Sequence, residues 1–201
     1  MAPGQTSAHN HEFFGNRTTN KDSTYDSMIG QATTCSTRDD TAGYWVPTLL
    51  DGNQVIRAQS LLIYYRGCNF GPVCKTAAGR HIEPFPADLR MISDNVVPPT
   101  DPKNIIVQFP QCWDGVNLDS PDHRSHMAFA SGSGCPSSHP VRVPFITEVV
   151  RYPVTVAGKT LSSGPMSTMH ADFWNTWDQD ALTSLTERCL NGTVDCGRID
   201  S

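Results

Sequence analysis

The sequence is poor in charge, and above all in positive charge. Charged residues make up 17% of its 201 residues, and 15 Lys and Arg stand against 20 Asp and Glu, which gives a formal net charge of −5. Binding to the phosphate backbone of nucleic acids usually needs a basic surface, so we expect no nucleic-acid partner. The longest apolar stretch, Leu61–Tyr65, falls far short of the roughly 20 residues of a membrane-spanning helix, so we expect no membrane association.

Several catalytic signatures are absent as well. The sequence has no GxSxG motif, no glycine-rich phosphate-binding loop and no dinucleotide-binding fingerprint. None of the cysteines forms a CxxC pair, which leaves a zinc ribbon or a thioredoxin-type redox centre without support. Any active centre must therefore come from less regular groups of polar residues.

Seven cysteines nevertheless indicate an oxidising compartment. Cys35 has no obvious partner, and the spacing of the others favours three short bridges without fixing the connectivity: Cys68–Cys74, Cys112–Cys135 and Cys189–Cys196. Glycosylation sequons begin at Asn16 and Asn191. The start of the chain, MAPGQTSAHNHE, lacks the features of a signal peptide, so we interpret the sequence as a mature or trimmed form of a secreted, extracellular protein.

The residue pattern predicts a mainly β fold. With 15 Gly and 15 Pro, we expect a single domain over residues 1–201, a β-sandwich or jelly-roll-like fold with long disulfide-closed loops and one C-terminal helix. The helix is predicted over Asp178–Leu190, with Asn191-Gly192 as its cap. The strands are predicted over Tyr44–Leu50, Val55–Arg66, Leu89–Ile92, Asn104–Phe109, Ser125–Ala130 and Phe145–Val156. The first two are expected to form a hairpin around the turn Asp51-Gly52-Asn53.

Five of the seven histidines lie in three short segments that also carry carboxylates and aromatic rings: His9, His11, His123, His126 and His170. On a strand, the spacing of His9 and His11 would present both imidazoles on one face. A third nitrogen from the other three would complete a zinc site of catalytic type, with one position open to water, and copper also accepts imidazole. We therefore predict a divalent transition metal, zinc or copper, against the alternative that His9-Asn10-His11 is only an exposed polar arm.

Carboxylates and tryptophans in the same segments indicate chemistry on glycans. Hydrolysis of a glycosidic bond uses two carboxyl groups, and sugar rings stack on flat aromatic surfaces. We predict catalytic roles for His11, Glu12, Asp122, His123 and Asp172. We expect sugars to contact Trp113, Trp174 and Trp177, against the alternative that these tryptophans belong to the core.

Seven motifs along the chain resemble, in order, those of one secreted family of bacteria and fungi. They are HNHEFFGN, TTCSTRDDTAGYWVPTL, IYYRG, PFPADLRMI, FPQCWDGVNLDSPDHRSHMAF, CPSSHPVRVP and HADFWNTWD. The family is catalogued as domain of unknown function nineteen-ninety-six and is sometimes joined to carbohydrate-binding modules of the WSC type. The resemblance covers roughly residues 4–197 and implies secretion, disulfide bonds and surroundings of polysaccharide or cell wall.

The sequence departs from this family pattern in three places. The region between Arg90 and Asn104 is shorter and lacks an aromatic-Cys segment, and an upstream segment that often carries a cysteine is missing. Either loss would explain an unpaired Cys35. The Cys68–Cys74 loop looks like an addition, whereas the histidine motifs are all kept.

Two classes of function fit these features. The leading hypothesis is a secreted, metal-dependent hydrolase of a polysaccharide or cell-wall glycan, in which Asp122 or Asp172 orients an imidazole or acts as acid and base. The alternative is a non-catalytic, secreted metal- or glycan-binding protein. A metal-dependent nuclease is a second alternative, which the acidic composition disfavours. In a further alternative the histidines only build a hydrogen-bonded core and bind no metal. We expect a monomer.

Overall fold

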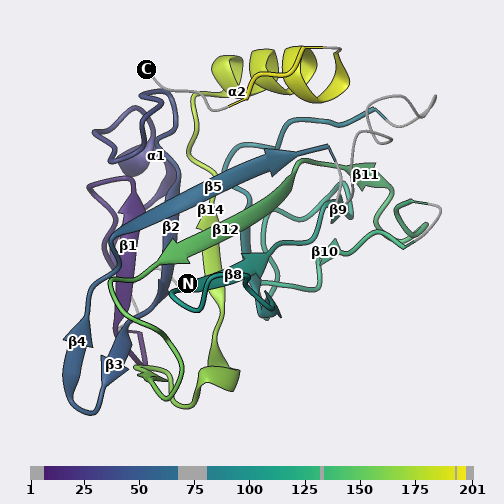
Figure 1. The fold of residues 1–201 in the computed structure, drawn as a ribbon. Coiled ribbons are helices and arrows are strands. Elements are labelled where there is room, and N and C mark those ends of the chain that lie inside the picture. The colour runs from purple at the N-terminus through teal and green to yellow at the C-terminus, as the bar shows by residue number, and fades with distance from the viewer. Residues whose placement is uncertain (1–6, 68–80, 132–133, 193, 198–201) are drawn as a thin grey trace.

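The computed structural model describes residues 7–67, 81–131, 134–192 and 194–197, and it is built on two four-stranded antiparallel sheets (Figure 1). In spatial order, the first sheet contains β1 (His11–Gly15), β2 (Gly43–Pro47), β14 (Ala171–Trp174) and β6 (Arg90–Ser93). The second contains β5 (Ser60–Arg66), β12 (Phe145–Arg151), β8 (Asn104–Gln108) and β7 (Asn95–Val97). In Figure 1 the second sheet crosses in front of the first, and both contribute to one apolar core, so the predicted mainly β sandwich is confirmed.

Shorter elements surround the two sheets. One small three-stranded sheet contains β10 (Met127–Ala128), β9 (Cys112–Trp113) and β11 (Val141–Arg142). A second contains β13 (Thr160–Leu161), β3 (Leu49–Asp51) and β4 (Gln54–Ile56). The helical segments are α1 (Tyr25–Met28), η2 (Met166–Thr168), α2 (Gln179–Leu185) and the π-helical turn η3 (Thr186–Asn191). Within the described part of the chain, no helix is both long enough and apolar enough to cross a membrane.

The core lies between the two large sheets. Phe173 of β14 lies at its centre, with ring-centroid distances of 5.5 Å to Tyr44 and 5.2 Å to Phe85. Because side chains alternate along a strand, the neighbours of these core residues point to the other face of the first sheet. Trp45 and Asp172 are such neighbours, and they are directly opposite each other in the register of β2 and β14. This outer face of the first sheet carries the candidate site.

Most of the predicted elements are confirmed, with shorter bounds. The hairpin around Asp51-Gly52-Asn53 joins β3 to β4, and Pro153 follows the end of β12. The Asp178 side chain caps α2 by accepting a hydrogen bond from the Ala181 amide. Gly192 differs from the expected left-handed cap: its φ is −81°, and a Cβ there would lie 2.4 Å from the Arg188 carbonyl oxygen. Close backbone approach therefore explains this glycine.

Two of the three predicted disulfides are confirmed, Cys112–Cys135 and Cys189–Cys196, while Cys68–Cys74 lies outside the described residues. Cys35 has a free thiol. The sequons, however, are poor acceptor sites in the folded chain. Asn16 is 3% exposed and donates from Nδ2 to two backbone carbonyls, and Asn191 exchanges hydrogen bonds with the backbone of Ile82. Glycosylation therefore gives no support for secretion here.

Removing the Cys112–Cys135 bridge is expected to destabilise the chain strongly. Its partners are 23 residues apart, and Cys112 is fully buried. Closing a loop of this length in the unfolded chain corresponds to about 3 kcal/mol. We expect the Cys112→Ser/Cys135→Ser variant to lose about this much free energy of unfolding in urea titrations. The matched Cys189→Ser/Cys196→Ser variant, which opens a loop of 7 residues, should lose less, and equal losses in both would contradict the loop-closure account.

Candidate metal centre

Three strands of the first sheet bring distant histidines together. His11 is the first residue of β1, and His9 lies in the bend just before it, so only His11 of this pair is on a strand. His170 immediately precedes β14, which is joined to β1 through β2. Between His9 and His11, the Asn10 carbonyl accepts hydrogen bonds from Ser162 Oγ and from the Thr48 amide. These bonds fix the N-terminal segment against the sheet.

The imidazoles of His9, His11 and His170, called the histidine trio below, converge through their Nε2 atoms. His170 Nε2 lies 3.3 Å from His9 Nε2 and 3.4 Å from His11 Nε2. Zinc binds imidazole nitrogen at about 2.0–2.1 Å, so two nitrogens in a tetrahedral site are about 3.3–3.4 Å apart. The two measured separations therefore match the edges of a tetrahedral metal site. Within the residues that the structure describes, this trio is the group of metal-ligand side chains whose donor atoms lie close enough to share an ion.

The far edge of the His170 ring orients it for ligation. His170 Nδ1 lies 2.9 Å from the Thr168 carbonyl oxygen. A carbonyl oxygen can only accept a hydrogen bond, so Nδ1 of His170 carries the hydrogen. Its Nε2 therefore presents a lone pair towards His9 and His11. On His11, Nδ1 lies 3.4 Å from Ser7 Oγ. Metal-bound histidines usually make such contacts through their second ring nitrogen, because these contacts fix the tautomer and the ring orientation.

Burial keeps the trio neutral. Desolvation, followed by the charges of the neighbouring His9 and His170, lowers the pKa of His11 to about 3. Burial also lowers the pKa values of His9 and His170. A metal ligand must be the neutral imidazole. At neutral pH the three rings are therefore in the form that binds a metal.

A buried carboxyl group lies beside the trio. Asp172 Oδ2 is 3.7 Å from His170 Nε2 and 3.9 Å from His11 Nε2, and this oxygen has no hydrogen-bond partner among the described residues. Burial raises the pKa of Asp172 to about 7, against a hydrogen bond from Trp45 that lowers it. Behind it, Glu148 is fully buried on β12, and desolvation followed by the charge of Asp172 raises its pKa well above the usual range. A cation in front of Asp172 would offset the cost of ionising it.

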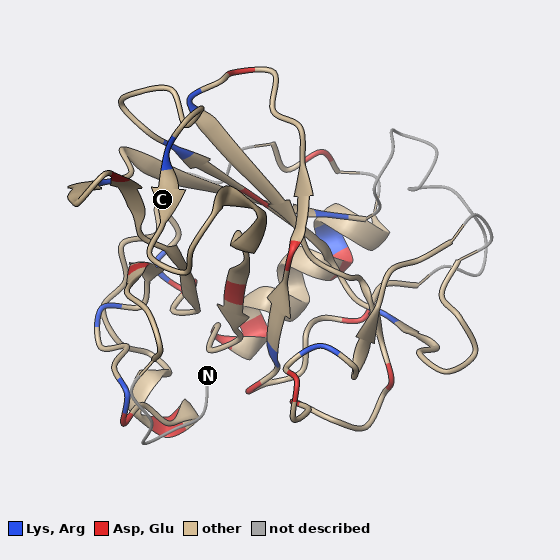
Figure 2. Ribbon diagram, turned by 90° about the horizontal axis from the view of Figure 1, so that it is seen from below, with Lys and Arg blue, Asp and Glu red and all other residues tan. Residues whose placement is uncertain are grey.

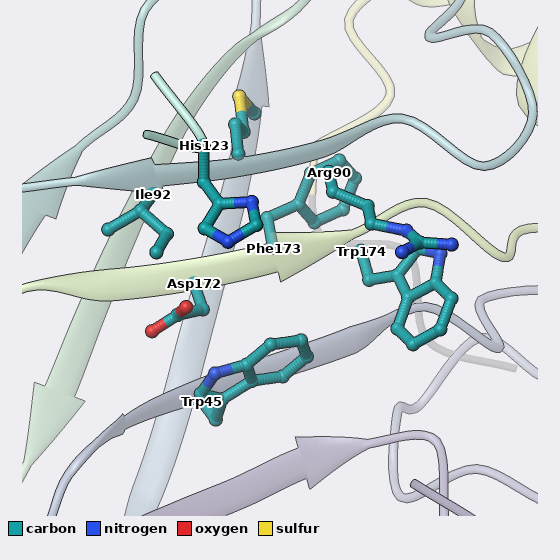
Figure 3. A pocket seen from close by; sticks show the side chains of 8 residues that line it. Trp45, Arg90, Ile92, His123, Asp172, Phe173 and Trp174 are labelled. Carbon is teal, nitrogen blue, oxygen red and sulfur yellow. The ribbon is translucent and has the colours of Figure 1, made fainter. Parts of the chain in front are cut away.

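Asp172 also lines a small hollow on the outer face of the sheet (Figure 3). The hollow is small, with room for about one water molecule. Its walls include Trp45, Arg90, Ile92, His123 and Trp174, and in Figure 3 the His123 ring is directed towards Asp172 and Trp45. The hollow thus joins His123 to the trio through Asp172.

The predicted residues of the second histidine segment do not join the trio. His123 is held by Asp119, whose Oδ1 lies 2.7 Å from Nδ1. His126 is 1% exposed, and its two ring nitrogens contact Ser120 Oγ at 2.8 Å and the Arg90 carbonyl oxygen at 2.7 Å. The prediction of His126 as a metal ligand is therefore wrong, because both of its nitrogens are used in holding the loop.

Asp122 and Glu12 are also placed away from the trio. Asp122 accepts hydrogen bonds from the Ser125 amide, the Ser120 hydroxyl and the Arg124 amide, and these bonds lower its pKa. Glu12 points to the other face of β1, where it accepts a hydrogen bond from the Ala58 amide, and burial raises its pKa. Both carboxyls hold local structure, whereas Asp172 alone of the predicted acids lies beside the trio.

The predicted tryptophans are mainly structural. Trp174 is 2% exposed, donates to Asp88 and packs under the Arg90 guanidinium at 4.1 Å, while Trp177 is 5% exposed and donates to Tyr65. Neither ring can stack on a sugar from its buried position. Trp113 is half-buried, and its indole N–H donates to the Asn117 carbonyl oxygen.

Sequence reasoning missed two groups around the site. Trp45 supplies a wall of the hollow, and Asp119 orients His123. Asp119 carried a usable signal, since it stands four residues before His123 among the acids of one segment. Trp45 carried none, because its strand is buried along its whole length.

One comparison with known proteins agrees with the motif resemblance. A family model described as "Domain of unknown function (DUF1996)" matches residues 1–103 and 97–177, which include all three histidines of the trio. No curated protein matches the chain. No solved structure matches it either.

Proposed function

Since the chain belongs to the DUF1996 family, whose description gives no activity, we propose its function from the geometry of the site. The proposal is an extracellular, metal-dependent hydrolase of a polysaccharide or cell-wall glycan. The histidine trio would hold a divalent transition metal, zinc or copper. The observation that carries the proposal is the convergence of three Nε2 atoms, two of whose separations match tetrahedral edges.

Three features support hydrolysis at this site. Three imidazole ligands leave a fourth position for water or substrate, which is the pattern of catalytic rather than structural zinc. When bound, such an ion polarises a substrate oxygen and lowers the pKa of a water molecule. The hollow lined by Asp172 and Trp45 has room for about one water molecule next to the carboxyl group that lies beside the trio (Figure 3).

The extracellular glycan setting is supported by the cysteines and the family motifs. Two disulfides, Cys112–Cys135 and Cys189–Cys196, are typical of oxidising compartments. A nuclease has little support, because the net charge is −5 and basic residues alternate with acidic ones along the ribbon in Figure 2. The resemblance to secreted proteins linked with carbohydrate-binding modules favours a glycan.

Product analysis tests this function directly. Tag-free protein is stripped with chelator, reloaded with zinc or with copper, and incubated with a panel of plant, fungal and bacterial wall polysaccharides. We expect soluble products that depend on the metal and on His11. The proposal fails if the loaded protein releases no product from any polysaccharide of the panel, or if the His11→Ala variant releases as much as the wild type.

A second candidate function is metal binding without turnover, and the position of Asp172 favours it. With Oδ2 at 3.7 and 3.9 Å from two nitrogens of the trio, a small movement of this carboxylate would close the coordination sphere. Closed four-ligand sites are typical of structural metals.

The Asp172→Asn variant separates the two functions. If the carboxylate closes the sphere, zinc affinity should fall by about 100-fold or more, as expected for loss of a ligand. If the hydrolase proposal holds, affinity should fall by about 10-fold, as for an outer residue, while turnover falls further. Isothermal titration with zinc gives the affinity, and Asp119→Asn is the matched control outside the trio.

A further inference from the structure

We propose that the reaction at the trio is hydrolysis of an acyl group carried by a sugar, an ester or an amide, with His123 as the proton-transfer residue and Asp119 as its positioning residue. This inference rests on the proposed hydrolase function and names the bond that the site breaks. It follows from which acids and bases surround the trio and how each is held.

The carboxyl groups near the trio do not fit cleavage of a glycosidic bond. Most enzymes that cleave glycosidic bonds use two carboxyl groups about 5–9.5 Å apart, one on each side of the bond. Asp172 is buried, with its side chain 6% exposed. Asp94 acts electrostatically on His170, but its Oδ2 lies 2.5 Å from Arg124 Nη1 in an ion pair. Asp119 is bound to His123. Each of these acids is buried or already paired.

His123 is held in a strained conformation that directs it into the hollow. Its φ is +55°, which is uncommon for a residue with a side chain, and such strain clusters at functional sites. Asp119 contacts Nδ1 at 2.7 Å, so the ring turns its other edge towards Asp172 (Figure 3). A carboxylate on Nδ1 fixes the Nδ1–H tautomer and supports the charged imidazolium.

The loop around His123 is pinned at many points, which keeps this conformation. The His123 carbonyl accepts a hydrogen bond from the Ile92 amide of β6, and its amide donates to the Ser120 carbonyl. Asp122 and His126 hold the same turn through Ser120 and Arg90. Residues predicted as catalytic or metal-binding thus serve as the support of His123.

Hydrolysis at an acyl carbon fits the arrangement, in which His123 would act as acid and base and an ion held by the trio would stabilise the oxyanion. Attack on it needs a base for water, stabilisation of the developing oxyanion and an acid for the leaving group. His123 Nε2 takes a proton from water while the water oxygen forms a bond to the acyl carbon. The bond from that carbon to the sugar oxygen or nitrogen then breaks, the electron pair stays on the sugar atom, and His123 returns the proton to it. The products are a free carboxylic acid and the deacylated sugar.

The test uses the full, tag-free, zinc-loaded chain with acetylated xylan, chitin oligosaccharides and p-nitrophenyl acetate. We expect zinc-dependent release of acetate or p-nitrophenol without new reducing ends. His123→Gln should keep one zinc and lower kcat by about 100-fold, as for loss of a general acid and base. His139→Gln, on a neighbouring loop, should match the wild type.

Asp119→Ala gives an independent test, which also covers the case that His123→Gln fails to fold. We expect kcat to fall by about 10-fold with KM unchanged. In ¹⁵N NMR spectra the His123 ring should lose its pure Nδ1–H tautomer, a change that a merely structural role of Asp119 would not produce.

The outcomes separate this inference from the proposed function. New reducing ends without acetate would leave the hydrolase standing and overturn the acyl assignment. Zinc binding with neither product would overturn both and favour binding without turnover. Loss of zinc from His123→Gln, or full activity in that variant, would overturn the role of His123.

Discussion

Replacing His11 and His170 by alanine is expected to abolish tight binding of zinc or copper. Zinc sites bind with apparent free energies of about 10 kcal/mol or more, so each of three ligands accounts for about 3 kcal/mol, which is more than 100-fold in affinity. Because His170 Nε2 lies within 3.4 Å of both other nitrogens, its loss should cost at least as much as loss of His11. Isothermal titration of the chelator-treated chain measures both affinities.

The control for this experiment is His81→Ala. His81 is exposed, pairs with Glu83 and Glu187, and is not a member of the trio. Zinc should raise the melting temperature of the wild type and of this control, because it binds only the folded chain. The melting temperature of the His11→Ala/His170→Ala double variant should not change with zinc. Equal zinc affinity in all three proteins would show that the trio is not the binding site.

The second large effect is expected at Asp40, as a pH dependence of stability. Asp40 is 6% exposed, and each carboxylate oxygen lies 3.0 Å from the Tyr44 hydroxyl. Burial raises the pKa of Asp40 to about 7, against hydrogen bonds from Tyr44, Cys35 and the Ala42 amide that lower it. The folded chain therefore holds a proton that the unfolded chain has already released between about pH 4 and pH 7.

The sign of the effect follows from linkage. A group with a raised folded-state pKa makes stability fall as pH rises through this window, by about 1.4 kcal/mol per pH unit. The free energy of unfolding of Asp40→Asn, relative to the wild type, should thus increase by up to about 4 kcal/mol from pH 4 to pH 8. The exposed neighbour variant Asp39→Asn should show no such trend. A constant difference for Asp40→Asn, measured by urea unfolding at each pH, would contradict the buried-acid account.

The fold was predictable where one face of an element is apolar. The helix from Asp178 and the hairpin at Asp51-Gly52-Asn53 follow from local chemistry that the structure keeps. Strand β1 was missed because it buries Glu12 and exposes Phe13, which reverses the usual pattern. Strand β14 was missed because it is buried on both faces and shows no alternation.

The sequence predicted which types of residue form the site, but not which individual residues. The sequence offered five histidines, and the pairing of β1, β2 and β14 selects three of them across a separation of about 160 residues. No local pattern distinguishes His170, whose Nε2 faces His9 and His11, from His126, whose two ring nitrogens are both used in loop contacts. The sequence also could not show that Trp174 and Trp177 pack inside the fold, where they cannot contact a sugar.

X-ray absorption spectroscopy on the reloaded chain tests the central claim most directly. After elemental analysis, the zinc edge of the tag-free protein reports the ligands around the ion. A histidine trio predicts one zinc per chain, with three imidazole nitrogens at about 2.0 Å and one further oxygen ligand. Absence of stoichiometric metal after reloading, or a bound metal without imidazole scattering, would contradict the metal centre.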